Sequence, residues 1–144
     1  MDELRKLINT FLALNEDDLL NEVLSMPETK QYILDLNLQE QLFKKGINAD
    51  GQTLGVYSPT TEKLSKGRKK AGSHYTLKDT GEFYKSVFIK NNPTYFEIEE
   101  NYAVFDIIYK YGSTILGLTA ENLEKLILFV TPKLQTLILT KLNL

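Results

Sequence analysis

His74 is the only histidine of the chain, and it lies between Ser73 and Tyr75 in a long polar stretch. A serine beside a histidine could act as a nucleophile with its base, but that chemistry also requires an acid that orients the histidine and a rigid oxyanion site. The surrounding segment is rich in glycine and lysine and supplies neither. We therefore expect His74 to be a solvated loop residue without a catalytic role.

Asp79-Thr80-Gly81 is a second candidate for chemistry. Aspartic proteases use this tripeptide, and Ile115-Leu116-Gly117 could be the apolar segment that follows it in retroviral forms. The reaction needs two carboxylates that share a proton in a rigidly held loop. Asp79 followed three residues later by Glu82 instead fits a capping box. The sequence therefore predicts that Asp79 caps a short helix over residues 80–86, with a protease as the remote alternative.

The densest positive charge lies in residues 63–70, which contain five bases and no acid: Lys63, Lys66, Arg68, Lys69 and Lys70. Lysine-rich loops bind the phosphate backbone of nucleic acids in a salt-sensitive way, and Tyr57 and Tyr75 flank the run and could stack on bases. The same charges could contact an acidic protein surface, or could simply be solvated. The sequence leaves these three interpretations open.

Composition excludes several other classes of function. The chain has 144 residues, no cysteine and a net charge of −2, so disulfides and thiol catalysis are excluded and no global charge recruits nucleic acid. We expect no metal and no cofactor, because one histidine without cysteine is a poor set of zinc ligands. No apolar run reaches the roughly 20 residues that span a bilayer, and residues 1–11 lack the apolar core of a signal peptide. We expect a soluble protein, made in the cytoplasm, with no membrane contact.

The elements that position these residues begin with a helical arm over residues 1–45. One apolar stripe at helical spacing comprises Leu4, Leu7, Ile8, Phe11 and Leu12, and a second comprises Leu19, Leu20, Val23 and Leu24. Asn15 can cap the second helix, and Pro27 should end it. Residues 28–45 mix helical and strand-like spacing. A helix is favoured there, ended by Gly46 after two lysines.

Residues 46–144 are expected to form the core, with a mobile loop at about 57–75. Residues 58–61 predict a turn or a helix start, and residues 66–73 show no periodicity. Residues 87–89 and 95–99 predict an antiparallel hairpin with one solvated face. Residues 104–111 fit either a helix or a strand, ended by Gly112.

A long C-terminal helix should begin at Thr119, its N-cap. Pro132 predicts a kink, or a break at which Thr131 caps the chain again. The leucines near the C-terminus either pack on the N-terminal helices or face a neighbouring subunit. The predicted fold is one α+β domain: N-terminal helices, a long basic loop, a small antiparallel sheet and a C-terminal helix packed on the sheet.

Several motifs follow one another in a specific order. Residues 51–61 read Gly-x-x-Leu-x-x-Tyr-Ser-x-x-Thr, a lysine-rich loop covers 63–73, and residues 77–86 read Leu-x-Asp-Thr-Gly-x-x-x-x-Ser. A predicted strand pair, Tyr111-Gly112 and Leu116-Gly117-Leu118 come next. Over residues 46–135 this order resembles the phage virion-morphogenesis or tail-completion family. The residues that carry the resemblance are Gly51, Ser58, Asp79, Thr80, Gly81, Ser86, Gly112 and Gly117.

The resemblance implies a non-enzymatic structural protein of the head–tail connector, the neck or the end of the tail. Such a protein acts in the virion, as a ring of identical copies in contact with other virion proteins and without a cofactor. This chain departs from the family in two places. The acidic arm over residues 1–45 is additional, and Tyr102-Ala103 is separated from Tyr111-Gly112 without the family's histidine.

The basic loop suggests how such an assembly could form. Its composition is too polar to order by itself, so we expect it to order against an adjacent subunit or partner with an acidic surface. Residues 1–28 contain seven acids and two bases. Within this segment Glu16, Asp17, Asp18 and Glu22 are a candidate for that surface in a homo-oligomer.

Overall fold

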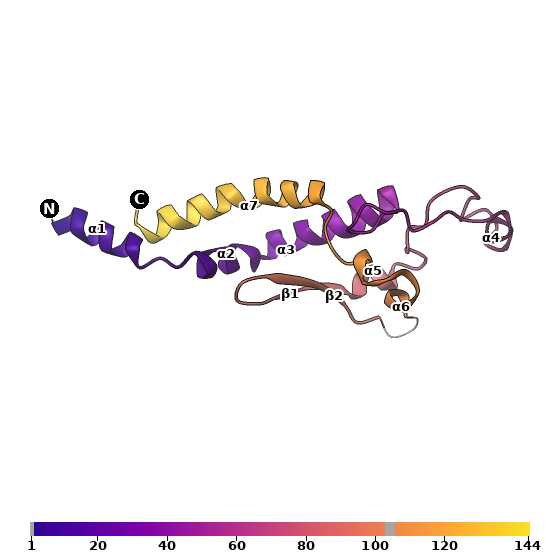
Figure 1. Ribbon diagram of the computed structural model, residues 1–144, viewed down its shortest axis with the longest axis horizontal. Helices are drawn as coiled ribbons and strands as arrows, with labels where there is room; N and C mark the ends of the chain where they lie inside the picture. Colours follow the sequence, from indigo (N-terminus) through magenta and orange to yellow (C-terminus); the bar gives the residue numbers. More distant parts are fainter. Residues whose placement is uncertain (1, 103–105) are drawn as a thin grey trace.

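The computed structural model describes residues 2–102 and 106–144. Figure 1 shows an elongated molecule with both chain ends at one extremity and the short helix α4 at the other. The fold is α+β, as the sequence predicts, with a C-terminal helix that packs against the region of a small antiparallel sheet. The elements in chain order are α1 (Asp2–Leu12), α2 (Glu16–Leu24), α3 (Pro27–Leu34), the π-helix η1 (Asp35–Lys45), α4 (Pro59–Leu64), α5 (Glu82–Ser86), β1 (Val87–Asn91), β2 (Phe96–Glu100), α6 (Ile107–Tyr111), the 3₁₀ helix η2 (Ser113–Ile115) and α7 (Ala120–Lys141).

Local capping signals set the ends of the N-terminal helices. The side chain of Asn15 accepts a hydrogen bond from Asp18 N at 3.0 Å and caps α2, as predicted. Pro27 lies in the first turn of α3, where its missing N–H is not needed. Pro27 therefore starts a helix directly after α2 has ended at Leu24.

Residues 28–45 are helical, as favoured, but residues 35–45 form a π-helix. Hydrogen bonds in such a helix join residues five apart, and long stretches are rare. Gly46 ends it at φ 61°, a left-handed conformation that glycine adopts without steric cost. The predicted helix end at Gly46 is confirmed.

Two clusters of buried apolar residues form the core. The first joins α2, α3, η1, β1 and α7, and contains Val23, Ile33, Leu36, Ile89, Leu126 and Val130 among others. The second joins η1, α5, β1, α6 and η2, and its members are Leu38, Leu42, Phe83, Tyr84, Val87, Ile107 and Ile115. The α3–η1 segment contributes to both clusters, so it is the central element of the fold.

The predicted hairpin is present and pairs Val87 with Glu100 and Asn91 with Phe96. Along β1 buried and exposed residues alternate, with Val87 and Ile89 inward and Phe88 and Lys90 in solvent. The ambiguous segment 104–111 is helical from Ile107 to Tyr111. Its remaining part includes residues that lie outside the described chain.

Helix α7 runs from Ala120 to Lys141 through Pro132 as one helix (Figure 1). The alternative of a break recapped by Thr131 is therefore wrong. The Thr131 hydroxyl instead donates to Ile127 O at 2.6 Å within the helix. Buried Leu126 and Val130 anchor α7 in the core just before the proline, and this packing stabilises a helix that local propensity would interrupt.

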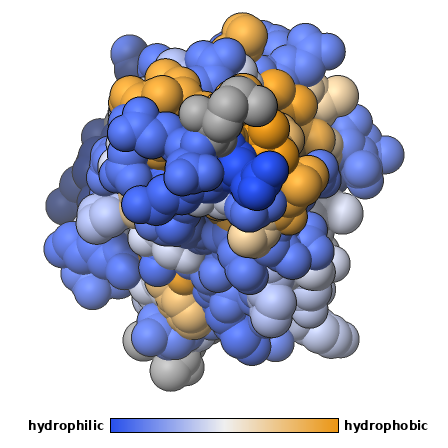
Figure 2. All heavy atoms as spheres, turned by 90° about the vertical axis from the view of Figure 1, so that its left-hand side faces the viewer, coloured by the Kyte–Doolittle hydropathy of each residue, from blue (hydrophilic) through white to orange (hydrophobic). Residues whose placement is uncertain are grey.

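Helix α1 contains no buried residue. Its apolar stripe is largely in solvent, with exposed fractions of 52% for Leu4 and 58% for Phe11. The nearby C-terminus adds exposed Leu139 and Leu144. Figure 2 faces this end of the molecule and shows hydrophobic atoms between the hydrophilic ones. An isolated helix of this length is marginally stable in water, and α1 buries no side chain that would stabilise it against the rest of the fold.

Candidate functional site

Residues 56–75, which we call the basic arm, leave the body of the protein and return to it. The two sides are joined by an antiparallel bridge between Val56 and His74. Tyr57 N donates to Ser73 O at 2.9 Å, and Gly72 N donates to Tyr57 O at 3.0 Å. The arm is thus a loop whose base is closed by two short antiparallel segments. Figure 1 shows its helix α4 projecting from one end of the molecule.

The tip of the arm, residues 58–72, is hydrogen-bonded within itself. Ser58 caps α4 by accepting from Thr61 N at 3.1 Å. The buried Ser65 hydroxyl accepts from Lys69 N at 3.0 Å, and a carboxylate oxygen of Glu62 accepts from Ala71 N at 3.0 Å. The start of a helix at Ser58 is confirmed. Mobility of the loop in the free protein stays a prediction.

The five basic residues of the tip fall into two groups. Lys63, Lys66, Arg68 and Lys70 are exposed. Lys69 is half-buried, with Nζ 3.5 Å from an Asp79 carboxylate oxygen and 5.7 Å from the centre of the Tyr57 ring. Four cations therefore face solvent, and the fifth holds the arm against the segment that carries Asp79.

His74 connects the arm to η1. Its Nε2 lies 2.8 Å from Phe43 O, and a Cβ built on Gly46 would lie 2.5 Å from the His74 ring. His74 is half-buried, so the expectation of a fully solvated loop histidine needs correction. Its contacts are those of a packing residue.

A cavity of about 420 Å³ lies at the base of the arm, and we call it the tyrosine cavity. Its walls come from the arm, from the segment before α5 and from α6. They are Tyr57, Thr61, Lys69, Tyr75, Leu77, Lys78, Asp79, Thr80, Gly81, Phe83, Tyr102, Ile107, Lys110 and Tyr111. Aromatic rings and ammonium groups thus surround one concave space.

The capping box predicted at Asp79 is wrong. Helix α5 begins at Glu82, and Gly81 occupies the cap position with φ 88° and without a side-chain hydrogen bond. The Thr80 hydroxyl accepts from Glu82 N at 3.3 Å, while the exposed Asp79 pairs with Lys69. The left-handed turn at Gly81 changes the chain direction just before the helix, so Asp79 does not reach the free N–H groups.

The remote protease alternative requires a second carboxylate beside Asp79. Asp79 is the only carboxylate among the described residues that line the cavity. The nearest charged partner that the structure shows for it is the ammonium group of Lys69. Among the described lining residues, a single chain therefore does not supply the proton-sharing pair on which that chemistry depends.

The other residues of the predicted motif have structural positions. Gly51 lies in a turn at φ 77°, and its own N–H donates to Asn48 O at 3.0 Å. The Ser86 hydroxyl donates to Phe83 O at 2.6 Å. Gly112 follows α6 at φ 89°, and a Cβ on Gly117 would lie 3.0 Å from Ala49 Cβ.

Gly117 belongs to a buried network that sequence reasoning missed. Asn37 Nδ2 donates to Ile115 O at 2.9 Å, and Asn37 Oδ1 accepts from Gly117 N at 3.2 Å. Gln41 Nε2 donates to Gly117 O at 2.7 Å, and its Oε1 accepts from Thr119 N at 2.9 Å. The two fully buried amides thus hold the segment before α7 by its backbone.

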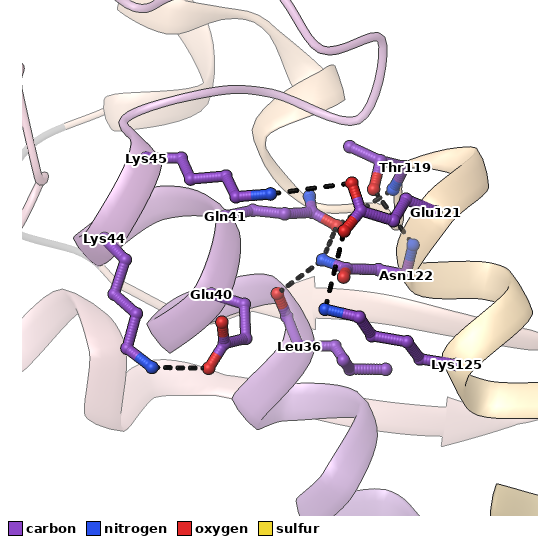
Figure 3. Close-up of polar contacts among 9 residues, drawn as sticks. All are labelled: Leu36, Glu40, Gln41, Lys44, Lys45, Thr119, Glu121, Asn122 and Lys125. Carbon is purple, nitrogen blue, oxygen red and sulfur yellow. Dashed lines mark hydrogen bonds and ion pairs between the residues drawn. The ribbon is translucent and has the colours of Figure 1, made fainter.

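Asn122 extends this network into α7 (Figure 3). Its Nδ2 donates both to Gln41 Oε1 at 2.9 Å and to Leu36 O at 3.1 Å. We call Asn37, Gln41 and Asn122 the amide clamp. At its margin Glu121 pairs with Lys45 and with Lys125, each at 3.6 Å.

A third ion pair beside the clamp joins Lys44 and Glu40 at 2.7 Å. The hydrogen bond from Lys44 lowers the pKa of the Glu40 carboxyl below its ordinary value, against the opposing effect of desolvation. Both side chains lie near the surface, so the pair adds little to stability. The clamp itself, which is buried, holds η1 to α7.

No group of three or more histidine, cysteine or acidic residues in residues 2–102 and 106–144 is placed to hold a metal ion. Over the same described ranges, none of the helices combines the length and hydrophobicity that crossing a membrane requires. Models of known families, curated proteins and solved structures all give no match to this chain.

Proposed function

We propose that this chain is a non-enzymatic structural protein of a phage virion, of the head–tail connector, neck or tail-completion type. It acts by assembling with copies of itself and with other virion proteins, and it is made in the cytoplasm of the bacterial host. One observation carries the proposal. The fold leaves two unlike surfaces uncovered at opposite ends of an elongated molecule.

The first surface is the tip of the basic arm. Four exposed cations lie within six residues of Leu64, whose exposed fraction is 80%. An apolar side chain at the end of a projecting element is suited to a pocket on a neighbour, and the cations are suited to an acidic rim around that pocket. The fold itself does not need Leu64, because it lies outside both core clusters.

The second surface is the end formed by α1 and the start of α2. It carries the exposed apolar stripe of α1, and beside it Glu16, Asp17 and Asp18 are exposed in the first turn of α2. These acids also favour the helix N-terminus. The apolar and acidic surface at this end is therefore complementary to the apolar and basic tip of the arm on a second copy.

Unlike surfaces at opposite ends produce a head-to-tail contact, which closes into a ring or continues as a filament. A closed ring is the form that a connector requires. Salt screens such a contact over about 10 Å at 0.1 M ionic strength, so assembly should weaken as salt rises.

Two charge-reversed variants test the proposal by analytical ultracentrifugation. The tip variant carries Lys63→Glu, Lys66→Glu and Lys70→Glu, and the end variant carries Glu16→Lys, Asp17→Lys and Asp18→Lys. Each should remain monomeric where the wild type assembles, with a nearly unchanged melting temperature for the tip variant. In a mixture each surface meets one of opposite charge, the wild-type tip with the wild-type end and the reversed tip with the reversed end, so assembly should be restored.

A matched control carries Lys44→Glu, Lys85→Glu and Lys90→Glu, the same change in charge away from the arm. It should assemble as the wild type does. Normal assembly of the tip variant would show that the arm is merely solvated. The neighbouring reading frames test the virion role separately: portal or tail-tube genes beside this one support it, and an unrelated operon contradicts it.

A further inference from the structure

The tyrosine cavity has no role in the assembly proposed above, and its size and lining are those of a ligand site. Its volume of about 420 Å³ falls in the ~300–1,000 Å³ range of small-molecule pockets. Such pockets combine apolar and aromatic walls with a few convergent polar groups. The cavity has both.

The aromatic part of the lining is a chain of rings. Tyr57 and Tyr75 lie 4.9 Å apart between ring centres, and Tyr75 and Tyr111 lie 6.2 Å apart. Tyr102 packs edge-on against Phe83 with the centres 6.0 Å apart. The four tyrosines are half-buried, so part of each ring remains accessible. Aromatic side chains in such a site stack on nucleobases with little regard for base identity.

The hydroxyl groups of these four tyrosines are available. Within residues 2–102 and 106–144 none of them has a hydrogen-bond partner in the protein. The buried Tyr84 next to the site differs, because its hydroxyl donates to Thr76 O. The cavity therefore offers phenolic donors that the fold does not use.

The charged part of the lining is positive. The described lining residues include three lysines and one carboxylate, that of Asp79, and so have a formal charge of +2. Lys78 Nζ lies 5.1 Å from the centre of the Phe43 ring and 5.6 Å from that of Tyr84. Lys110 Nζ lies 5.2 Å from the centre of the Tyr111 ring. Ammonium groups and hydroxyl donors together match the oxygens of a phosphate group.

We propose that the tyrosine cavity binds a nucleotide unit, with its base against the tyrosine rings and its phosphate at Lys78 and at Lys69, whose ion pair with Asp79 would be exchanged for the phosphate. The unit is either a free mononucleotide or one nucleotide of a single strand. The four exposed cations of the arm tip lie in the same segment of the chain as Lys69, so a strand that leaves the cavity along the arm would meet them. The cavity itself is separate from the proposed head-to-tail contact and does not depend on it, whereas the tip cations take part in both proposals.

The test is a ¹H–¹⁵N NMR titration of the full chain with thymidine 5′-monophosphate, thymidine, inorganic phosphate and an oligothymidylate. The mononucleotide should shift the amide signals of cavity residues and bind more tightly than thymidine or phosphate alone. If the ligand is a single strand, the oligothymidylate should bind at least tenfold more tightly than the mononucleotide, and the tip variant should lose this difference in affinity. Equal affinities of the oligothymidylate and the mononucleotide would identify the free mononucleotide as the ligand.

Two substitutions define the site, and unchanged melting temperatures and spectra would verify the fold. Lys78→Gln and Tyr57→Leu should each weaken binding of the mononucleotide at least fivefold. The matched controls Lys90→Gln and Tyr95→Leu, outside the cavity, should leave it unchanged. Lys78→Gln should also assemble as the wild type does, which separates this proposal from the function above.

Three results would overturn the proposal. The first is the absence of shifts at cavity residues with every nucleotide. The second is equal binding of phosphate alone, which would make the site one for simple anions. The third is a preference of the cavity for an acidic peptide over the nucleotides.

Discussion

The amide clamp and the basic arm are both held by hydrogen bonds between side chains and backbone, but their surroundings differ. In the clamp, Asn37 and Gln41 are fully buried, and their partners lie 76 to 80 residues away. In the arm tip, Ser58 and Glu62 bond to backbone groups three and nine residues away, at exposed positions.

The difference matters because a buried polar group that loses its partner cannot form a hydrogen bond with water instead. A buried backbone group left without a hydrogen bond costs about 1–3 kcal/mol, whereas exposed groups exchange one partner for another. The clamp therefore belongs to the stability of the fold. The arm is free to serve a contact outside the chain, and its charges can change without unfolding the body.

The largest effect should follow the loss of one clamp residue. Gln41→Leu keeps the volume but leaves Gly117 O and Thr119 N without their partner, and should lower the free energy of unfolding by about 2–6 kcal/mol. Urea denaturation followed by circular dichroism measures the change. The control Gln31→Leu removes only an exposed bond to Asp35 and should stay within about 0.5 kcal/mol. Equal effects would show that the clamp is no more important than the surface.

A smaller effect should follow at the junction of the two regions. Gly46→Ala forces a side chain into a left-handed conformation, which costs about 1–2 kcal/mol, and also places its Cβ against the His74 ring. Gly67→Ala is the control, because its φ is 81° and nothing lies within 4 Å of the added Cβ. Thermal unfolding should show a larger loss for Gly46→Ala. A similar loss in both would mean that His74 moves aside easily.

Tyr84 should make stability depend on pH at the base of the arm. Burial, and to a lesser extent the nearby Tyr57, raise the pKa of the Tyr84 phenol. The unfolded phenol ionises near pH 10, so the contribution of the neutral phenol is complete below that pH and is lost as pH rises above it. Tyr84→Phe should therefore lose stability less steeply between pH 9.5 and 11, as urea titrations would measure. Exposed Tyr95→Phe should leave the slope unchanged, and an equal slope in all three proteins would contradict the burial of Tyr84.

Signals that act within a few residues were predictable from the sequence. Asn15, Gly46 and Thr119 end or begin helices through bonds to their own neighbours. The amide clamp was not predictable in this way, because its partners are distant in the chain. The only local sign of it is a pair of amides four residues apart among buried leucines, a spacing that the π-helix places together.

The site was predicted in part. The basic residues of the tip are exposed on a projecting arm, but Lys69 is engaged with Asp79 and is not one of the free charges. The tyrosine cavity depends on α6 meeting the arm and the segment before α5, which no motif indicates. At Pro132 a local signal was present but misleading. The sequence predicted a kink or a break there, whereas tertiary packing keeps α7 a single helix.

The smallest effect should follow at Asp79, where the sequence motif predicted a structural cap. As a helix cap, Asp79 would be worth about 0.5–2 kcal/mol. The structure assigns it only an exposed ion pair with Lys69 at 3.5 Å, and such pairs contribute about 0–1 kcal/mol. Asp79→Ala should therefore change the free energy of unfolding by less than Thr119→Ala, which removes the observed cap of α7. The comparison needs only urea denaturation of the two variants under one condition. A loss at Asp79 equal to that at Thr119 would restore the capping box and would place the arm base, like the clamp, in the stable framework.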